Sequence, residues 1–207
     1  LYPQPPGDGG PWRCRGLRQA GGRLRRGQPV TMDVVLDSIS AEELVWLRSL
    51  EDKDGFDTMT CRPIRLRSRE EKLKLYQYAL DEPNTVILGL WTSDKKYLIG
   101  KLTASDWNPR NHSMEIGYYL CPEWRGKGYM RSALQTFCRM LFLDQGCNKI
   151  MAQTGAFNVS SIRLLESCGF RRDGVLRQHH EKGGILYDDF LYSLLADECI
   201  KPLESRE

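Results

Sequence analysis

The sequence lacks any long hydrophobic run. No stretch approaches the roughly 18 apolar residues that a membrane span requires, which excludes an integral membrane protein. Only three histidines are present, and the seven cysteines are an odd number with no Cys-x-x-Cys spacing. We therefore expect neither a cysteine-based metal site nor a disulfide scaffold. Most thiols are expected to be reduced and partly buried, and the protein to be cytoplasmic.

Acidic and apolar residues are scarce in the first 31 positions. This segment carries six Arg and one acid, a charge of +5 in a chain of net charge +3, so the remainder is mildly acidic. It also holds seven of the 19 Gly and five of the ten Pro. Such a segment buries too little to offset its ordering entropy. We interpret residues 1–31 as a flexible tail, translated from upstream of Met32 or left by expression. A nucleic-acid-binding arm or a transit peptide is less favoured.

The rest of the chain has the composition of an ordinary globular protein. The whole sequence is 41% hydrophobic and 28% charged over 207 residues, enough for one sizeable core. No internal repeat marks a second domain. We therefore expect one domain over residues 32–198 and a C-terminal tail over 199–207.

Hydrophobic periodicity and capping signals predict an α+β fold (α/β mixed). Two Ser-x-x-Glu capping boxes, at Ser40 and at Ser68, mark helix starts, and residues 51–57 read as a loop. The pattern predicts a mixed, mostly antiparallel sheet of six to seven strands with about four helices. The expected strands are 34–36, 86–91, 97–104, 114–120, 149–153, 174–180 and 186–195, and the helices are 40–50, 68–82, 129–146 and 158–168. The helix between the strands at 114–120 and 149–153 implies parallel pairing of these two strands.

A glycine-rich turn between a strand and a long helix is a candidate anion site. In Arg125-Gly126-Lys127-Gly128-Tyr129-Met130 the glycines allow close approach of backbone N–H groups to a pyrophosphate, beside the positive end of the helix. The turn is neither a P-loop nor a Rossmann fingerprint, because the strands before it form an antiparallel meander. A glycine-rich helix start without a ligand is the plain alternative.

The surrounding residues resemble motif A of the GNAT N-acetyltransferases. The run from Met114 to Tyr129 contains the pattern Arg/Gln-x-x-Gly-x-Gly/Ala, except that Met130 stands where Gly or Ala is usual. Residues 158–170 resemble motif B, and 174–195 is similar to the end of the RimJ/RimL-like branch. The resemblance covers about 32–195 and implies a central strand that splays from its neighbour at the cofactor site.

The resemblance implies acetyl-CoA as co-substrate and no metal. Backbone of the splayed strand would hold the pantetheine arm, and backbone amides of the turn would hold the pyrophosphate between two arginines. The asparagine and serine of motif B would contact the pantetheine side, although simple helix capping is compatible with both. The residues assigned to the cofactor are Tyr118, Tyr119, Leu120, Arg125, Gly126, Lys127, Gly128, Tyr129, Met130, Arg131, Asn158 and Ser161.

Direct transfer of the acetyl group from acetyl-CoA to an amine needs a base. A protonated amine has no lone pair with which to attack the thioester. Glu115 is the candidate general base, and a strand glutamate in an ion pair is the plain alternative. The general acid for the departing thiolate is open. Leu165 stands where many relatives carry Tyr, so Tyr192, Tyr187 or water would serve, or no acid is needed.

The expected function is N-acetylation of a primary amine. A peptide or protein N-terminus is favoured over a polyamine or aminoglycoside, although four acids could form a pocket for a polycation: Asp106, Glu115, Asp188 and Asp189. The alternative function is a non-catalytic acyl-CoA-binding regulatory module, because the usual Tyr is missing at Leu165. Homodimerisation through a sheet edge is common in similar proteins. The pair His179-His180 reads as hairpin surface, because neighbouring strand residues face opposite sides.

Overall fold

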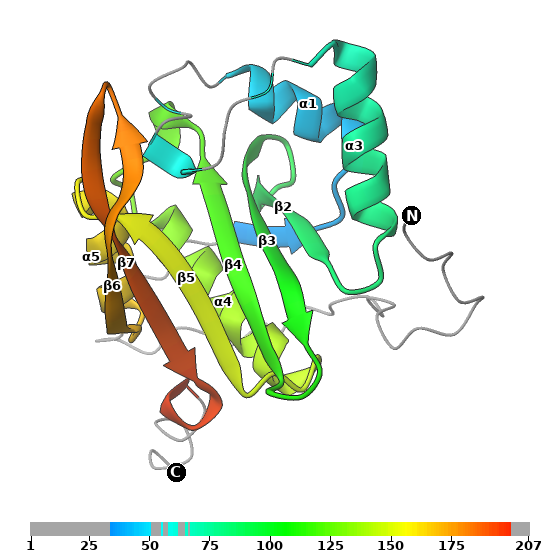
Figure 1. Cartoon of the computed structure of the whole chain (residues 1–207). Coiled ribbons are helices and arrows are strands. Elements are labelled where there is room, and N and C mark those ends of the chain that lie inside the picture. The colour runs from blue at the N-terminus through cyan, green and yellow to red at the C-terminus, as the bar shows by residue number, and fades with distance from the viewer. Residues whose placement is uncertain (1–33, 51–54, 56–57, 62–64, 66, 200–207) are drawn as a thin grey trace. The chain divides into compact units, whose positions relative to one another are not determined.

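Seven strands form one mixed sheet in the order β1-β2-β3-β4-β5-β7-β6 (Figure 1). Every neighbouring pair is antiparallel except β4 and β5, which are parallel. The predicted α+β class, with its mostly antiparallel sheet and its parallel pair across a helical connection, is thereby confirmed. The strands are β1 Val34–Asp37, β2 Val86–Thr92, β3 Leu98–Asn108, β4 Ser113–Leu120, β5 Lys149–Gly155, β6 Arg171–Lys182 and β7 Ile185–Leu195.

The structure is a computed structural model that describes residues 34–50, 55, 58–61, 65 and 67–199. The predicted tail at 1–31, and the predicted tail at 199–207 apart from Cys199, lie outside these residues and stay predictions. Gly55, the one described residue of the predicted loop at 51–57, is helical, which corrects the prediction at that residue; Thr58 and Met59, just beyond the range, are helical as well. Within the described part of the chain, none of the helices is both long and apolar enough to cross a membrane.

The helices begin where the capping signals place them. Ser40 and Ser68 each accept a hydrogen bond from the backbone N–H three residues on, and Glu43 and Glu71 complete both capping boxes. The sequence patterns therefore identified two N-termini correctly, because these hydrogen bonds are local. The helices are α1 Ala41–Ser49, α3 Arg69–Asp81, α4 Tyr129–Leu143 and α5 Val159–Ser167, with a 3-10 turn, η1, at Pro122–Trp124.

The two faces of the sheet carry separate apolar clusters. The larger cluster joins Leu134, Phe137 and Leu141 of α4 to alternate residues of the strands, and α4 and α5 lie behind the sheet in Figure 1. The smaller cluster joins Leu44 and Leu47 of α1 to the other face, where α1 and α3 lie side by side. Because strand side chains alternate between faces, each strand residue can be assigned to the α4/α5 face or the α1/α3 face.

Replacing Ser40 by Ala should lower the free energy of unfolding by about 1 kcal/mol, because the first-turn N–H groups of α1 lose their side-chain acceptor. Urea denaturation followed by circular dichroism measures this loss. The control is Ser49→Ala, whose exposed hydroxyl donates to the carbonyl of Trp46 at the other end of α1. Its expected effect is below about 0.5 kcal/mol. Equal losses for both variants would contradict the role of the capping box.

Candidate functional site

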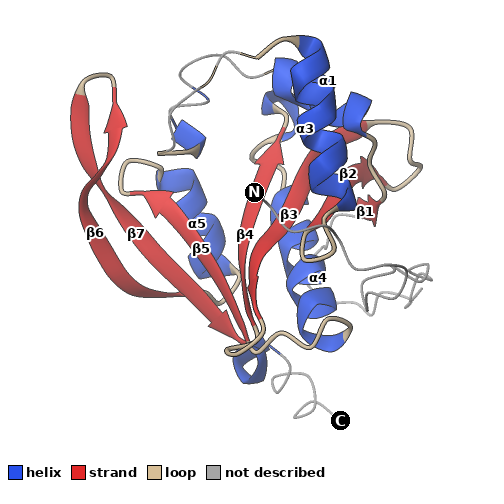
Figure 2. Ribbon diagram, turned by 45° about the vertical axis from the view of Figure 1, so that its right-hand side comes forward, coloured by secondary structure: helices blue, strands red, loops and turns tan. Residues whose placement is uncertain are grey.

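Strands β4 and β5 separate at their carboxyl ends. They pair in parallel at Ser113, Met114 and Glu115, and the rest of β4 pairs with β3 alone, as far as Leu120. Strand β5 instead continues along β7 as far as Gly155. The two strands diverge above this point in both views (Figures 1 and 2). The predicted splay of the central strand is confirmed.

A cavity of about 1420 Å³ follows this opening. It is larger than the roughly 300–1000 Å³ typical of small-molecule sites, which suits an extended ligand beside a second one. Its lining includes Glu115 and ten of the twelve residues assigned to the cofactor from sequence: Tyr118, Tyr119, Leu120, Arg125, Gly126, Gly128, Met130, Arg131, Asn158 and Ser161.

The other two assigned residues, Lys127 and Tyr129, do not line this cavity. Lys127 donates from Nζ to the carbonyl of Glu123 at 2.8 Å and lies over the ring of Trp124. Tyr129 meets the same ring edge-on, with centroids 5.4 Å apart. Their side chains therefore brace the turn from outside, so any contact with a ligand would come from their backbone amides.

The glycine-rich turn has the geometry of an anion site. Gly126 and Gly128 have φ of +73° and +87°, values that favour glycine, and Gly128 is the N-cap of α4. The first turn of α4 contains no acidic side chain and its N-cap makes no side-chain hydrogen bond. The free N–H groups and positive end of a 15-residue helix thus face the cavity mouth. Arg125 adds charge there and donates from Nε to the carbonyl of Leu120 at 2.9 Å.

Helix α5 is tied to β4 across the α4/α5 side of the opening. Asn158 caps α5 by accepting from the N–H of Ser161 at 3.2 Å, so the capping role is confirmed. The Ser161 hydroxyl in turn lies 2.7 Å from the Tyr118 hydroxyl. Burial raises the pKa of Tyr118 to about 12, against which the Ser161 hydrogen bond works only partly. Tyr118 is therefore a neutral hydrogen-bonding group near neutral pH.

Glu115 lies at the apex of the opening. It is the last residue of β4 that pairs with β5, and it is half-buried in the cavity wall. Its neighbours Met114 and Ile116 point into the core on the α4/α5 face, so the Glu115 carboxylate lies on the α1/α3 face. The carboxylate therefore approaches the cavity from the side opposite Tyr118 and Ser161.

The tyrosines offered as general acids lie elsewhere. Tyr192 is 2% exposed and donates its hydroxyl to Glu166 at 3.0 Å, and Tyr187 packs against Phe157. Neither lines the cavity. Leu165 is fully buried in the core. The prediction that Tyr192 or Tyr187 serves as the general acid is therefore not supported by their positions. The register of β7 places Tyr192 on the α4/α5 face, whereas Asp189 is the residue of β7 that lines the cavity.

A buried polar network that the sequence reading missed forms part of the cavity wall. His180 Nδ1 lies 3.1 Å from Asp189 Oδ1, and Gln153 donates to Asp189 Oδ2 at 2.6 Å. His180 and Asp189 are 2% and 1% exposed. The interpretation of His179-His180 as hairpin surface is therefore wrong for His180, whereas His179 is exposed as predicted. Two acids inside an otherwise apolar strand, Asp188-Asp189, were the available signal, because aspartate is depleted in strands.

Arginines and carboxylates line different parts of the cavity. Arg125, Arg131 and Arg163 come from the turn and from α4 and α5. The lining carboxylates are those of Asp106, Glu115 and Asp189, of which the latter two lie on the α1/α3 face. The fourth predicted acid, Asp188, is turned away and accepts from the N–H of Gln178 at 2.9 Å. One part thus suits a polyanion and another a cation.

Comparisons with known proteins agree with this architecture. The uncharacterized N-acetyltransferase YnaD of Bacillus subtilis is 30% identical over 87 residues, 42% of this chain and 51% of that protein. The probable N-acetyltransferase YjcK of the same species is 27% identical over 169 residues, 77% of this chain and 91% of that protein. The chain spans about half the length of the first two curated relatives it matches.

Among solved structures, the spermidine N-acetyltransferase of Vibrio cholerae, in complex with CoA and spermine, has a similar fold. Its TM-score is 0.74 at 20% identity, over 81% of this chain and 98% of that chain. A family model described as an acetyltransferase (GNAT) domain matches residues 40–171, more than half of the sequence. The chain therefore belongs to the GNAT acetyltransferase family.

Proposed function

We propose that this protein is an acetyl-CoA-dependent N-acetyltransferase that moves an acetyl group to a primary amine. The observation that carries the proposal is the opening between β4 and β5, which joins an anion-binding turn at its mouth to a carboxylate, Glu115, at its apex. A polyanionic thioester and a cationic amine would thus enter from sides of matching charge. Six cysteines in the described residues are free thiols, which supports a reducing, cytoplasmic compartment.

The chain's own groups fit acetyl-CoA. Backbone N–H groups at the start of α4, with Gly126 and Gly128 leaving space, would hold the pyrophosphate. Residues 118–120 of β4, which lie beyond the pairing of β4 with β5, would pair with the amides of the pantetheine arm, as a further strand would. Asn158 and Ser161 line the same stretch of cavity from α5. Acetyl-CoA supplies the activated acetyl group.

Glu115 would accept the proton that the ammonium must lose before attack, directly or through one water. The amine nitrogen then bonds to the thioester carbonyl carbon, becomes positively charged and releases its second proton to water, which leaves the neutral amide nitrogen. A backbone N–H of the splayed strand would stabilise the oxyanion before the carbon–sulfur bond breaks. The thiolate keeps the electron pair of that bond. A thiolate leaves readily without an acid, and Tyr118, with its pKa raised to about 12 by burial, would donate only a hydrogen bond.

The acceptor we favour is a polyamine. The cavity carboxylates Asp106, Glu115 and Asp189 offer charge beyond what a single reacting amine needs. The prediction of a peptide N-terminus rested on the likeness to the RimJ/RimL-like branch. A peptide N-terminus carries one positive charge and would contact fewer of these carboxylates. One of the proteins with a similar fold is a spermidine N-acetyltransferase solved with CoA and spermine, which agrees with the polyamine proposal.

Incubation of the full chain with acetyl-CoA and a panel of spermidine, an aminoglycoside and short peptides tests the proposal. We expect chromatography to show free CoA and acetylspermidine, with kcat/KM falling as salt rises because exposed charges are screened. Asp106→Asn should raise KM for spermidine roughly fivefold, for a loss of about 1 kcal/mol. Asp144→Asn, an exposed position at the C-cap of α4, is the control and should change nothing.

Each other outcome has a definite meaning. Preference for a peptide would replace the polyamine while keeping the enzyme. Micromolar acetyl-CoA binding without turnover of any amine would establish the non-catalytic module instead.

A further inference from the structure

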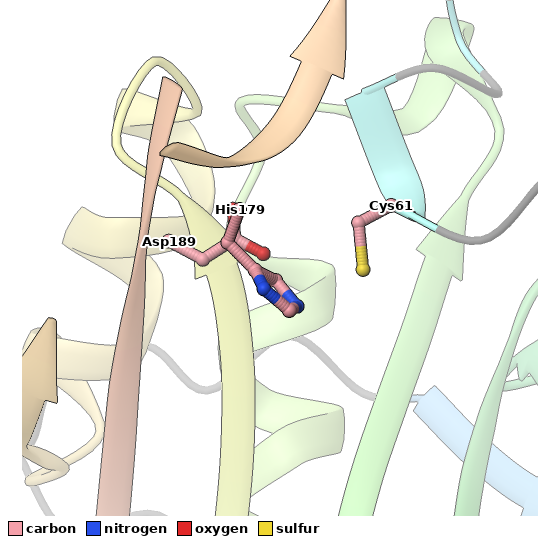
Figure 3. Close-up of side chains that lie close together, drawn as sticks. All are labelled: Cys61, His179 and Asp189. Atoms are coloured by element: carbon pink, nitrogen blue, oxygen red, sulfur yellow. The ribbon is translucent and has the colours of Figure 1, made fainter. Parts of the chain in front are cut away.

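Three side chains of the types that ligate metals meet on the α1/α3 side of the cavity. Figure 3 shows Cys61 facing His179 and Asp189 from a separate segment of the chain. One ligand atom from each, the sulfur, a ring nitrogen and a carboxylate oxygen, lies within 4.8 Å of the other two. Ligand atoms around a tetrahedral Zn²⁺ lie about 3–4 Å apart, since the bonds are about 2.0–2.3 Å long. Cys61 and His179 are exposed, so small rotations of their side chains can bring the ligand atoms from within 4.8 Å to within about 3–4 Å of one another.

A β-bulge brings His179 into this group. Leu176 pairs with Asp189 and His180 with Tyr187, so three residues of β6 oppose only Asp188 of β7. Gln178 in the bulge has φ of +51°, a left-handed conformation that is rare outside glycine. Asp188 holds the bulge by accepting from the Gln178 N–H. The bulge breaks the alternation of the strand, and both histidines line one cavity as a result. Left-handed residues of this kind cluster at functional sites.

Neighbouring groups already orient the ligand atoms. Gln153 donates from Nε2 to Asp189 Oδ2 at 2.6 Å and lies 3.9 Å from the sulfur of Cys61. His180 fixes the other carboxylate oxygen of Asp189 at 3.1 Å. Such contacts to a ligating carboxylate position it and raise metal affinity. Asp189 is 1% exposed, so its carboxylate has already lost most of its hydration shell before a metal binds.

We propose that Cys61, His179 and Asp189 form a binding site for a Zn²⁺-class cation. Mixed sulfur, nitrogen and oxygen donors suit borderline d-block ions and disfavour Mg²⁺ or Ca²⁺, which prefer oxygen alone. Three protein ligands leave a fourth position open to water. On binding, the Cys61 thiol loses its proton to solvent and the thiolate bonds to the metal. The metal would neutralise part of the acidic surface proposed for the acceptor amine, while the site itself does not depend on that function.

Titration of the full chain with Co²⁺ under reducing conditions tests the site without any activity assay. We expect one equivalent to produce a thiolate-to-cobalt charge-transfer band and the visible bands of tetrahedral Co²⁺, both removed by Zn²⁺. Cys61→Ser should abolish the charge-transfer band. His179→Gln should weaken binding at least tenfold, and Gln153→Ala, which removes an orienting contact, by roughly 10–100-fold.

The controls are Cys199→Ser and Cys14→Ser, which remove other thiols and should leave the band intact. Circular dichroism verifies that each variant is folded. A band that survives in Cys61→Ser, or weak binding at several equivalents that all variants share, would overturn the proposal as adventitious metal uptake. If the wild-type protein does not turn over acetyl-CoA, that result contradicts the proposed function and leaves the proposed metal site unaffected.

Discussion

Replacing Gly126 by Glu is expected to weaken CoA binding by at least about a hundredfold. Gly126 lines the cavity, and a Cβ atom added there would have no atom within 4 Å, so the substitution causes no steric clash at that atom. It places a carboxylate beside the proposed pyrophosphate position. Two like charges about 5 Å apart repel by about 3 kcal/mol at the effective dielectric constant of a protein surface. Calorimetric titration of acetyl-CoA into both proteins measures the difference.

The chain offers a matched control for backbone strain. Gly146 has φ of +67°, close to the +73° of Gly126, a Cβ atom added there would also have no atom within 4 Å, and it does not line the cavity. Gly146→Glu therefore carries the same left-handed penalty of about 1–2 kcal/mol and the same added charge. We expect its CoA affinity to match the wild type. If both variants lose affinity equally, backbone strain and not the anion site is responsible, and the turn is a structural helix start.

Glu115→Gln is expected to lower kcat by about 10²–10⁴-fold with little change in the affinity for acetyl-CoA. Glutamine has the size of glutamate and keeps a hydrogen-bonding side chain, but it cannot accept the proton of the ammonium. The rate of the variant should then rise with pH, because only amine already deprotonated in solution can attack. Steady-state kinetics over a pH series, with acetyl-CoA binding measured separately, tests both effects.

Glu123→Gln is the control for this experiment. Glu123 lies in η1, is exposed and does not line the cavity, so its loss changes the net charge without touching the proposed base. It should leave kcat and the pH profile unchanged. A Glu115→Gln enzyme with normal kcat would show that the carboxylate has only a structural role in the sheet. The acceptor ammonium would then have to lose its proton to water.

The local elements followed directly from the sequence. The helix starts at Ser40 and Ser68 were correct because a capping box involves residues three apart. Strand ends were less accurate. Strand β6 begins at Arg171, three residues before the expected start, because its first three residues are exposed and charged while pairing with Ser193 and Tyr192 of β7 supplies the backbone hydrogen bonds.

The sequence by itself determined which segments form the proposed cofactor side of this protein. The turn at 125–130 and the capped helix at 158 are contiguous segments whose function depends on backbone geometry within a few residues, and most of their assigned residues meet in one cavity. The sequence named acidic candidates for the proposed acceptor side, but tertiary structure decided how that side is assembled. Gln153, His180 and Asp189 come from three different strands, and His179 joins them only through a bulge held by Asp188. Strand register and bulges depend on long-range pairing, which no local pattern encodes.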